Sequence, residues 1–211
     1  MKEGKALVCF AMPDEARFFK RSAVAARVHV LVHGIGKQNA KHAICAALTK
    51  SPLKFVLTCG FAGGLEPKLV HGDVLFSTDD SELRSRLLTA GGHEGKFFCA
   101  DRIAVTAEEK WALWQKTGAD AVEMESEIIR AICREQKIPS ATVRVISDIA
   151  GEDLPLDFNQ LAKSDQSLDF VKLAFGVAKS PGKIPALMRL QKQTSAAARK
   201  LAQVLEKIIS A

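Results

Sequence analysis

The sequence predicts an α/β fold, a single domain in which a central mixed β-sheet is flanked by helices. One observation is the alternation of short apolar runs, rich in β-branched residues, with stretches of helical periodicity. Another is size, since 211 residues with 47% apolar content can bury one sizeable core. The apolar runs that we interpret as strands cover residues 6–12, 29–35, 55–59, 74–77, 97–100 and 141–146.

Helical spacing of apolar residues predicts helices at 14–20, 37–50 and 123–136. In the last of these, Met124, Ile128, Ala131 and Ile132 fall on one stripe. Two further helices, at 158–179 and 185–209, are expected to close the chain on either side of a Ser-Pro-Gly break. The whole chain, 1–211, is interpreted as one domain that ends in a basic helical segment at about 184–209.

Composition limits where the protein is expected to work. No apolar run is long enough to span a bilayer. The apolar start of the chain is short and is followed at once by Pro13, Asp14 and Glu15, which favours a buried strand over a signal peptide. The five cysteines are odd in number and form no C-x-x-C pair, which is typical of reduced thiols. We therefore expect a cytoplasmic protein.

Positive charge is concentrated near the end of the chain. From Phe170 onward there are eight Lys or Arg residues and one acidic residue, Glu206. Such a segment either forms the solvated face of a helix or makes peripheral contact with an anionic membrane or a lipid-bearing substrate. Aromatic residues are not interleaved with these charges, so nucleic acid is not an expected partner.

Motifs for common cofactors are absent from the sequence. Gly34-Ile35-Gly36 follows a predicted strand and begins like a dinucleotide fingerprint, but Asn39 stands where the third Gly is needed. The five histidines show no metal-ligand spacing, and there is no phosphate-binding loop or nucleophile elbow. We expect neither a metal nor a redox cofactor.

Three segments, taken together and in order, resemble the nucleoside phosphorylase and nucleosidase superfamily, which includes purine nucleoside phosphorylases and methylthioadenosine nucleosidases. They are the glycine turn CGFAGGL at 59–65 with the following Gly72-Asp73-Val74, the segment AVEMES at 121–126, and VRVISD at 143–148. The late segment DLPLD at 153–157 and the basic stretch 185–189 resemble the hopanoid-associated phosphorylase-like branch. That branch is thought to remove adenine from an adenosyl-lipid intermediate.

The resemblance implies cleavage of the N-glycosidic bond of a purine nucleoside, with adenine as the expected base. Bond cleavage builds positive charge on the sugar and negative charge on the departing base, and an enzyme must stabilise both. Asp148 ends a buried strand, where burial favours a protonated carboxyl that donates or shares a proton with the purine N7. The alternative for Asp148 is a helix cap or a turn residue.

The same resemblance assigns the sugar end of the site. Glu125 is expected to bind the ribose hydroxyls and Met124 to pack on the sugar, while Glu123, two residues from Glu125, can face the same side. Glu15 is expected to be the base that activates water, although Asp14 is able to replace it. For all three glutamates, the alternative is an acidic helix start that complements the helix dipole.

The glycine turn lets backbone N–H groups approach a ligand closely. The remaining residues that we assign to substrate binding are Phe61, Ala62, Gly63, Ser147 and Ile103. Two of them depart from the family pattern. Phe61 stands where relatives often carry a small hydroxyl residue, and Ile103 stands near the position of a base-stacking aromatic, so Phe61 or Phe98 is a candidate for stacking.

Three functions stay open from the sequence. The first is a nucleosidase that uses water, and the second is a phosphorylase whose phosphate contacts Arg17 and Lys37. The third is an inactive nucleoside-binding protein. Water is favoured because Glu15 repels an anionic nucleophile, and the presence of a complete acid and base set argues against an inactive protein. The family also implies a homo-oligomer, a dimer or larger.

Overall fold

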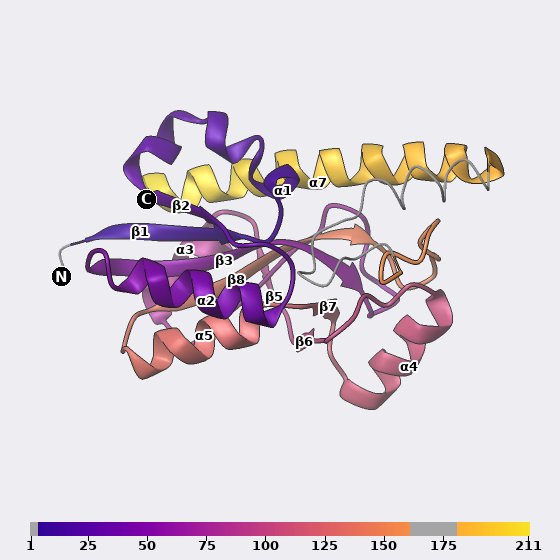
Figure 1. The fold of residues 1–211 in the computed structure, drawn as a ribbon, viewed down its shortest axis with the longest axis horizontal. Helices are drawn as coiled ribbons and strands as arrows, with labels where there is room; N and C mark the ends of the chain where they lie inside the picture. Colours follow the sequence, from indigo (N-terminus) through magenta and orange to yellow (C-terminus); the bar gives the residue numbers. More distant parts are fainter. Residues whose placement is uncertain (1–3, 161–180) are drawn as a thin grey trace.

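Eight strands form one mixed sheet within residues 4–160 and 181–211, which are the residues that the computed structural model describes (Figure 1). The sheet order is β2-β1-β3-β8-β4-β5, and β7 pairs with both β3 and β6. The strands are β1 (Lys5–Phe10), β2 (His29–Val32), β3 (Leu53–Gly64), β4 (Val74–Thr78), β5 (His93–Glu94), β6 (Phe97–Cys99), β7 (Ala121–Glu123) and β8 (Ser140–Asp148).

Four neighbouring strands, β2, β1, β3 and β8, run parallel. β4 is antiparallel to β8, and β7 is antiparallel to the end of β3. The sheet is therefore mixed, as the sequence predicts. The carboxyl ends of the parallel strands meet at one edge, which is where open α/β sheets present ligand sites.

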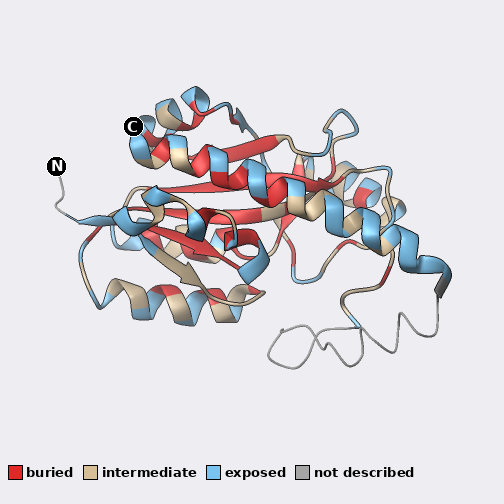
Figure 2. Ribbon diagram, turned by 90° about the horizontal axis from the view of Figure 1, so that it is seen from above, coloured by how far each residue is buried: buried red, intermediate tan, exposed pale blue. Residues whose placement is uncertain are grey.

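Helices cover both faces of the sheet and make a three-layer α/β structure (Figure 1, Figure 2). On one face, α7 (Ile184–Ser210) and α3 (Ser81–Thr89) pack on a core that includes Val8, Leu57 and Val143. On the other face lie α2 (Lys37–Leu48) and α5 (Ser126–Glu135), whose Ile44 and Ile129 are fully buried. This arrangement confirms the predicted fold class.

α4 (Ala107–Thr117) packs beside the β6–β7 pair and was not predicted from the sequence. It begins with a capping box in which the Thr106 hydroxyl accepts from the Glu109 N–H while the Glu109 carboxylate accepts from the Thr106 N–H. It ends at Gly118, whose φ of 60° lies in the left-handed region that glycine favours. α4 is thus a well-delimited helix that brings its side chains toward the end of β8.

Two predicted helices differ from the structure. The helix expected at 14–20 is one turn, α1 (Pro13–Ala16), followed by the 3-10 turns η1 (Phe19–Arg21) and η2 (Ala23–Arg27). The helix expected at 123–136 begins only at Ser126, because Glu123 ends β7 and its carboxylate accepts the N–H groups of Glu125 and Ser126. Most of the helix expected at 158–179 lies outside the described residues.

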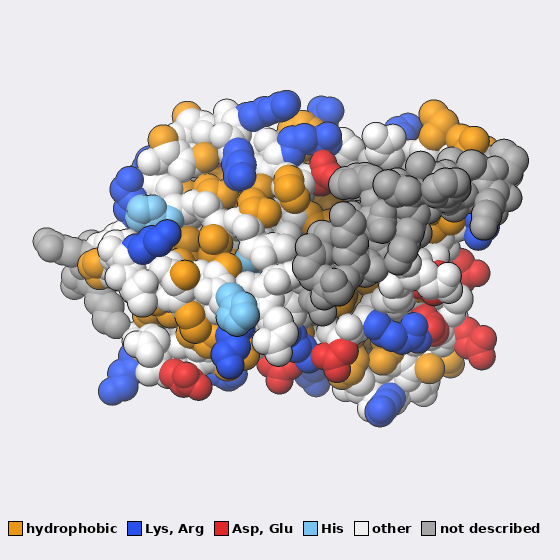
Figure 3. Space-filling model, in the orientation of Figure 1, with side chains coloured by type: hydrophobic (Ala, Val, Ile, Leu, Met, Phe, Trp, Pro, Cys, Tyr) orange, Lys and Arg blue, Asp and Glu red, His pale blue; other side chains and the backbone are white. Residues whose placement is uncertain are grey.

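The last helix, α7, has two unlike halves (Figure 2). From Ala197 onward, one stripe of the helix is buried against the sheet. The first turns are largely exposed, with Met188 65% accessible. Lys and Arg side chains lie along the upper edge of the molecule, over α7 and the η1–η2 segment (Figure 3). Among residues 4–160 and 181–211, no helix has the length and apolar character needed to cross a membrane.

Candidate functional site

Glu15 is held at the carboxyl ends of β1 and β3. Its carboxylate is buried and accepts hydrogen bonds of 2.9 Å from the backbone N–H groups of Ala11, Met12 and Phe61. A Cβ on Gly60 would lie 2.4 Å from Glu15 Oε1, so only glycine leaves room for this carboxylate. Burial raises the pKa of Glu15, and the Arg144 guanidinium and the three N–H donors oppose that rise. A carboxylate whose pKa is raised accepts a proton more readily than an ordinary glutamate.

Arg144 lies next to Gly60 across the β3–β8 pair and is the cation that faces Glu123 and Glu125. It is 2% exposed, and its Nη2 donates to Glu123 Oε2 at 2.6 Å, with Glu125 Oε2 at 3.8 Å. Its Nε and Nη1 are buried without a hydrogen-bond partner in the described part of the chain. Because unpaired buried donors are costly, the N–H groups of these two nitrogens are available to a bound ligand or water.

Glu125 faces Arg144 from the start of α5. Its Oε1 accepts from the backbone N–H of Gly36, at the N-terminus of α2, at 2.8 Å. Burial raises the pKa of Glu125 to about 7, the Arg144 guanidinium opposes the rise, and the neighbouring Glu123 adds to it. Glu15, Glu123, Glu125 and Arg144 together make what we term the glutamate–arginine cluster.

Glu123 has a different place from the one that the sequence suggested. Its carboxylate accepts hydrogen bonds from the Glu125 and Ser126 N–H groups, the Ser126 hydroxyl and Arg144. Although burial opposes ionisation, the guanidinium and these donors hold the pKa of Glu123 below its ordinary value. Four donors within the protein bind its carboxylate and its side chain is 1% exposed, so Glu123 positions Arg144, and a contact with substrate stays a prediction.

Asp148 ends β8, and its partner across the strands is Gly63. A Cβ on Gly63 would lie 3.1 Å from Asp148 Oδ2, which is tighter than an ordinary contact, so glycine favours this close approach. Asp148 Oδ1 accepts from the Ser147 hydroxyl at 2.8 Å, and the Asp148 side chain keeps 12% of its surface exposed. That exposed part lines a cavity of about 240 Å³ between the end of β8 and α7.

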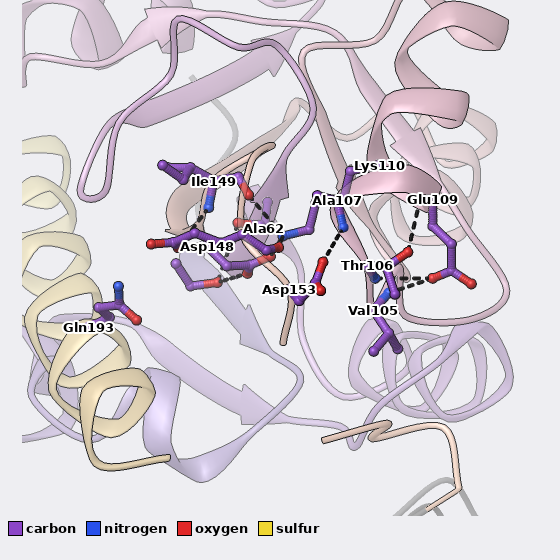
Figure 4. A network of polar contacts seen from close by, with 12 residues as sticks. Ala62, Val105, Thr106, Ala107, Glu109, Lys110, Asp148, Ile149, Asp153 and Gln193 are labelled. Carbon is purple, nitrogen blue, oxygen red and sulfur yellow. Dashed lines mark hydrogen bonds and ion pairs between the residues drawn. The ribbon is translucent and has the colours of Figure 1, made fainter. Parts of the chain in front are cut away.

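Lys110 reaches Asp148 from α4 and was not predicted as a site residue (Figure 4). Its Nζ lies 2.6 Å from Asp148 Oδ2 and donates at 2.9 Å to each of the carbonyls of Ile149 and Glu152. The Lys110 side chain is 0% exposed. Asp148, Ser147 and Lys110 make what we term the aspartate–lysine group.

β3 connects the two groups. Gly60 faces Glu15 and Gly63 faces Asp148, three residues farther along the strand, which is about 10 Å. The glutamate–arginine cluster and the aspartate–lysine group thus lie along the same strand, at one edge of the sheet. The structure places Glu15, Glu125 and Asp148 at this edge, and their roles stay predictions.

The other predicted site residues surround this strand. Phe61 is half-buried and packs against the core under α7, while Ala62 is buried and its carbonyl lies 3.4 Å from the Ser147 hydroxyl. Met124 is half-buried between the two glutamates in sequence. Ile103 lies in the loop before α4, where its N–H and carbonyl both bond to the Asn159 side chain. Their contacts with a substrate stay a prediction.

We expect Glu125→Gln to stabilise the protein at alkaline pH while leaving it unchanged at acid pH. A pKa raised to about 7 means that the folded state holds this proton more tightly than the unfolded state. The wild type therefore loses stability as pH rises from about 4.5 to about 7, by about 3 kcal/mol for such a shift. Glutamine keeps an acceptor for the Gly36 N–H but carries no charge. Urea unfolding at pH 5 and pH 8 measures this difference.

Glu127→Gln is the matched control for that measurement. Glu127 is exposed in the same helix, so its substitution is expected to change stability little at either pH. An equal effect of Glu125→Gln at both pH values would mean that charge burial at Glu125 is not the cause.

Comparisons with known proteins find relatives in sequence and in fold. A family model described as the Phosphorylase superfamily matches residues 80–175. The 5'-methylthioadenosine/S-adenosylhomocysteine nucleosidase of Anoxybacillus flavithermus is 25% identical, with 68% of this chain and 77% of the relative covered. The enzyme of the same name from Bacillus thuringiensis is 28% identical over the same shares.

Solved structures share the fold over nearly the whole chain. A Colwellia psychrerythraea nucleosidase of the same name, in complex with adenine, has a TM-score of 0.72 and 18% identity, covering 99% of this chain and 96% of the other. A futalosine hydrolase of Helicobacter pylori also has a TM-score of 0.72, with 17% identity and coverage of 98% and 97%. The chain is thus similar in sequence to the Phosphorylase superfamily model over residues 80–175 and to the nucleosidases over about two thirds of its length, and it shares their fold.

Proposed function

We propose that this protein is a purine nucleosidase that hydrolyses the N-glycosidic bond of an adenine nucleoside or adenosyl compound. The observation that carries the proposal is the placement of two chemically different groups at one sheet edge. A buried glutamate beside a guanidinium with free donors lies at one end, and an aspartate beside a cavity lies about 10 Å along β3 at the other. Relatives whose names describe adenosine-derived substrates support adenine as the base.

The glutamate–arginine cluster suits the sugar and the attacking water. The unpaired N–H groups of Arg144 hold a water oxygen near Glu15, which takes a proton from that water as it attacks C1′. The Glu125 carboxylate accepts hydrogen bonds from the ribose hydroxyls, and its negative charge favours the oxocarbenium-like sugar.

The Asp148 end suits the leaving base. As the bond between C1′ and N9 breaks, its electron pair goes to the purine, and N7 takes a proton from Asp148. Asp148 takes up that proton from solvent through the cavity at its exposed side before the bond breaks, and after the transfer it is again the carboxylate that pairs with Lys110. Glu15 returns its proton to water, so the net reaction is nucleoside plus water giving free purine and free sugar.

Charge at the sugar end favours water over phosphate. Three carboxylates surround one guanidinium there, and an anionic nucleophile is repelled by that excess. The cations that the sequence suggested for phosphate are engaged elsewhere. Lys37 pairs with Asp101 at 2.8 Å, while Arg17 donates to Ser195 and lies over the Phe18 ring. The phosphorolytic alternative therefore depends on Arg144 alone.

Product analysis tests the proposal. The purified protein is incubated with adenosine, methylthioadenosine and an adenosyl-lipid analogue, with and without phosphate. We expect free adenine and free sugar at the same rate in both buffers. A sugar 1-phosphate as the main product would make the protein a phosphorylase, and tight nucleoside binding without turnover would make it an inactive binding protein.

Finer assignments remain proposals. The hopanoid-associated branch, and with it an adenosyl-lipid substrate, depends on the segments at 153–157 and 185–189. Pro155 and Leu154 of the first segment, and Ala186 and Arg189 of the second, line the cavity beside Asp148, which supports a role near the base. A cytoplasmic location and a homo-oligomeric state also stay predictions.

We expect the basic face of α7 to bind anionic membranes weakly. The apolar stripe from Ala197 onward is already buried in the core, so it is not available to lipid. Only the basic face and the exposed first turns around Met188 remain. Co-sedimentation with anionic vesicles at low salt measures this contact. No binding, or equal binding after Arg199 and Lys200 are both changed to Gln, would remove the membrane role.

A further inference from the structure

We infer that Lys110 is a positioning residue for release of the base, whose ammonium stabilises the Asp148 carboxylate as its proton passes to the purine. The inference rests on the proposed function and adds a residue to it. The observation behind it is a completely buried ammonium group that lies against the group assigned to the base (Figure 4).

Every hydrogen of the Lys110 ammonium has an acceptor. One points to Asp148 Oδ2 at 2.6 Å and the other two to the carbonyls of Ile149 and Glu152 at 2.9 Å. None is left to contact a substrate, so Lys110 acts through Asp148. The geometry also fixes where Asp148 points, since Lys110 holds Oδ2 and Ser147 holds Oδ1.

The charge of Lys110, and not only its hydrogen bonds, has a purpose here. Burying an ammonium group is costly, and two neutral carbonyls would be satisfied by an uncharged donor. Among the described residues, Asp148 is the carboxylate paired with Lys110, because the nearby Glu152 carboxylate pairs with His71 at 3.0 Å. Lys110 therefore places one full positive charge beside the atom on which negative charge develops during the reaction.

α4 and the turn after β8 hold that charge in place. The Asp153 carboxylate accepts from the Ala107 N–H at 2.7 Å, and the Leu154 N–H donates to the Val105 carbonyl at 2.8 Å. These contacts fasten the start of α4 to the residues that follow Asp148. Because the charge is fixed before the reaction, it stabilises the transition state without reorganisation.

The step balances without a co-reactant. The C1′–N9 electron pair goes to the purine, the Asp148 proton moves to N7, and the new carboxylate is neutralised by the Lys110 ammonium, which keeps its own three hydrogens. A leaving group that needs no proton does not create the carboxylate. Its release should therefore be indifferent to Lys110.

That difference is the test. Lys110→Met, which keeps the length of the side chain, is compared with Lys116→Met, an exposed lysine in the same helix. Both are assayed with the purine nucleoside that the wild type cleaves best and with 4-nitrophenyl riboside. We expect Lys110→Met to lower kcat on the purine substrate by about 10–10³ and to change the nitrophenyl substrate less than threefold. Lys116→Met is expected to match the wild type on both.

A second measurement keeps the inference testable when Lys110→Met folds poorly. In an Asp148→Asn background there is no carboxylate to stabilise, so adding Lys110→Met should lower kcat less than threefold further. The double variant lacks both the Asp148 carboxylate and the Lys110 ammonium, so neither charge is left buried without its partner. Equal losses of the Lys110→Met single variant on both substrates, or additive losses in the double variant, would overturn the role of Lys110 while the proposed function stands. A wild type that releases no purine would instead overturn the proposed function, and this inference with it.

Discussion

Replacing Glu15 by Gln is expected to lower kcat on a purine nucleoside by about 10²–10⁴, the usual size of a lost general base, with a much smaller change in KM. Glutamine has the shape of glutamate and fits against Gly60, where a Cβ would be only 2.4 Å from Oε1. It cannot take a proton from water. The substitution therefore removes the chemistry and leaves the shape of the site.

The pH profile gives this result a second readout. Burial raises the pKa of Glu15, and the base works only when it is ionised. The wild type should therefore lose activity on acidification at a higher pH than an ordinary glutamate would cause. Glu125, whose pKa is about 7, contributes in the same direction because its negative charge supports the sugar cation. In Glu15→Gln, the part of this dependence that belongs to Glu15 should disappear.

Asp14→Asn is the control for Glu15. Asp14 precedes Glu15 in the same helical turn but is exposed, and we expect its substitution to leave turnover within threefold of the wild type. Steady-state kinetics on the two variants decide the matter. Full turnover by Glu15→Gln would transfer the base role to Asp14 or make phosphate the nucleophile.

The parts of the fold that the sequence predicted are those in which local pattern and burial agree. Buried strands such as β1 and β8 are continuous apolar runs between turn residues, and their positions were found within a few residues. α4 was missed because its fully buried position is occupied by Lys110, a residue type that pattern analysis places on the surface. Lys110 therefore interrupts the apolar stripe of α4 at the point where this helix meets the core.

Prediction of the site from local sequence pattern has the same limit. Asp148 ends a strand and Glu15 and Glu125 follow one, so their position and the family motifs together singled them out, and their roles stay predictions. Arg144 was overlooked, although a charged residue within an apolar strand has to find a buried partner and is therefore a visible signal. Nothing in the sequence pairs Lys110 with Asp148, because 38 residues separate them and the contact depends on how α4 folds back onto the end of β8.

Replacing Asp148 by Asn is expected to lower kcat on a purine nucleoside by about 10²–10⁴, a few kcal/mol of transition-state stabilisation. A purine is a poor leaving group as an anion, and asparagine keeps the size of aspartate but cannot transfer a proton to N7. Ground-state binding should change much less, because the proton matters mainly as the bond breaks. A nitrophenyl riboside, which needs no protonation, should be nearly indifferent if it fits the site.

Lys110 changes how the stability of that variant must be interpreted. Asparagine leaves the Lys110 ammonium, 0% exposed, without a counter-ion, and breaking a buried ion pair in this way costs about 3–5 kcal/mol. Asp148→Asn should therefore melt well below the wild type, and the double variant with Lys110→Met should recover much of that loss. Because the double variant regains its fold but not its proton donor, its kcat on the purine substrate should stay low. Melting curves and kinetics on both variants separate the loss of stability from the loss of the proton donor. If the double variant recovered activity together with stability, Asp148 would hold the site together and the acid would lie elsewhere.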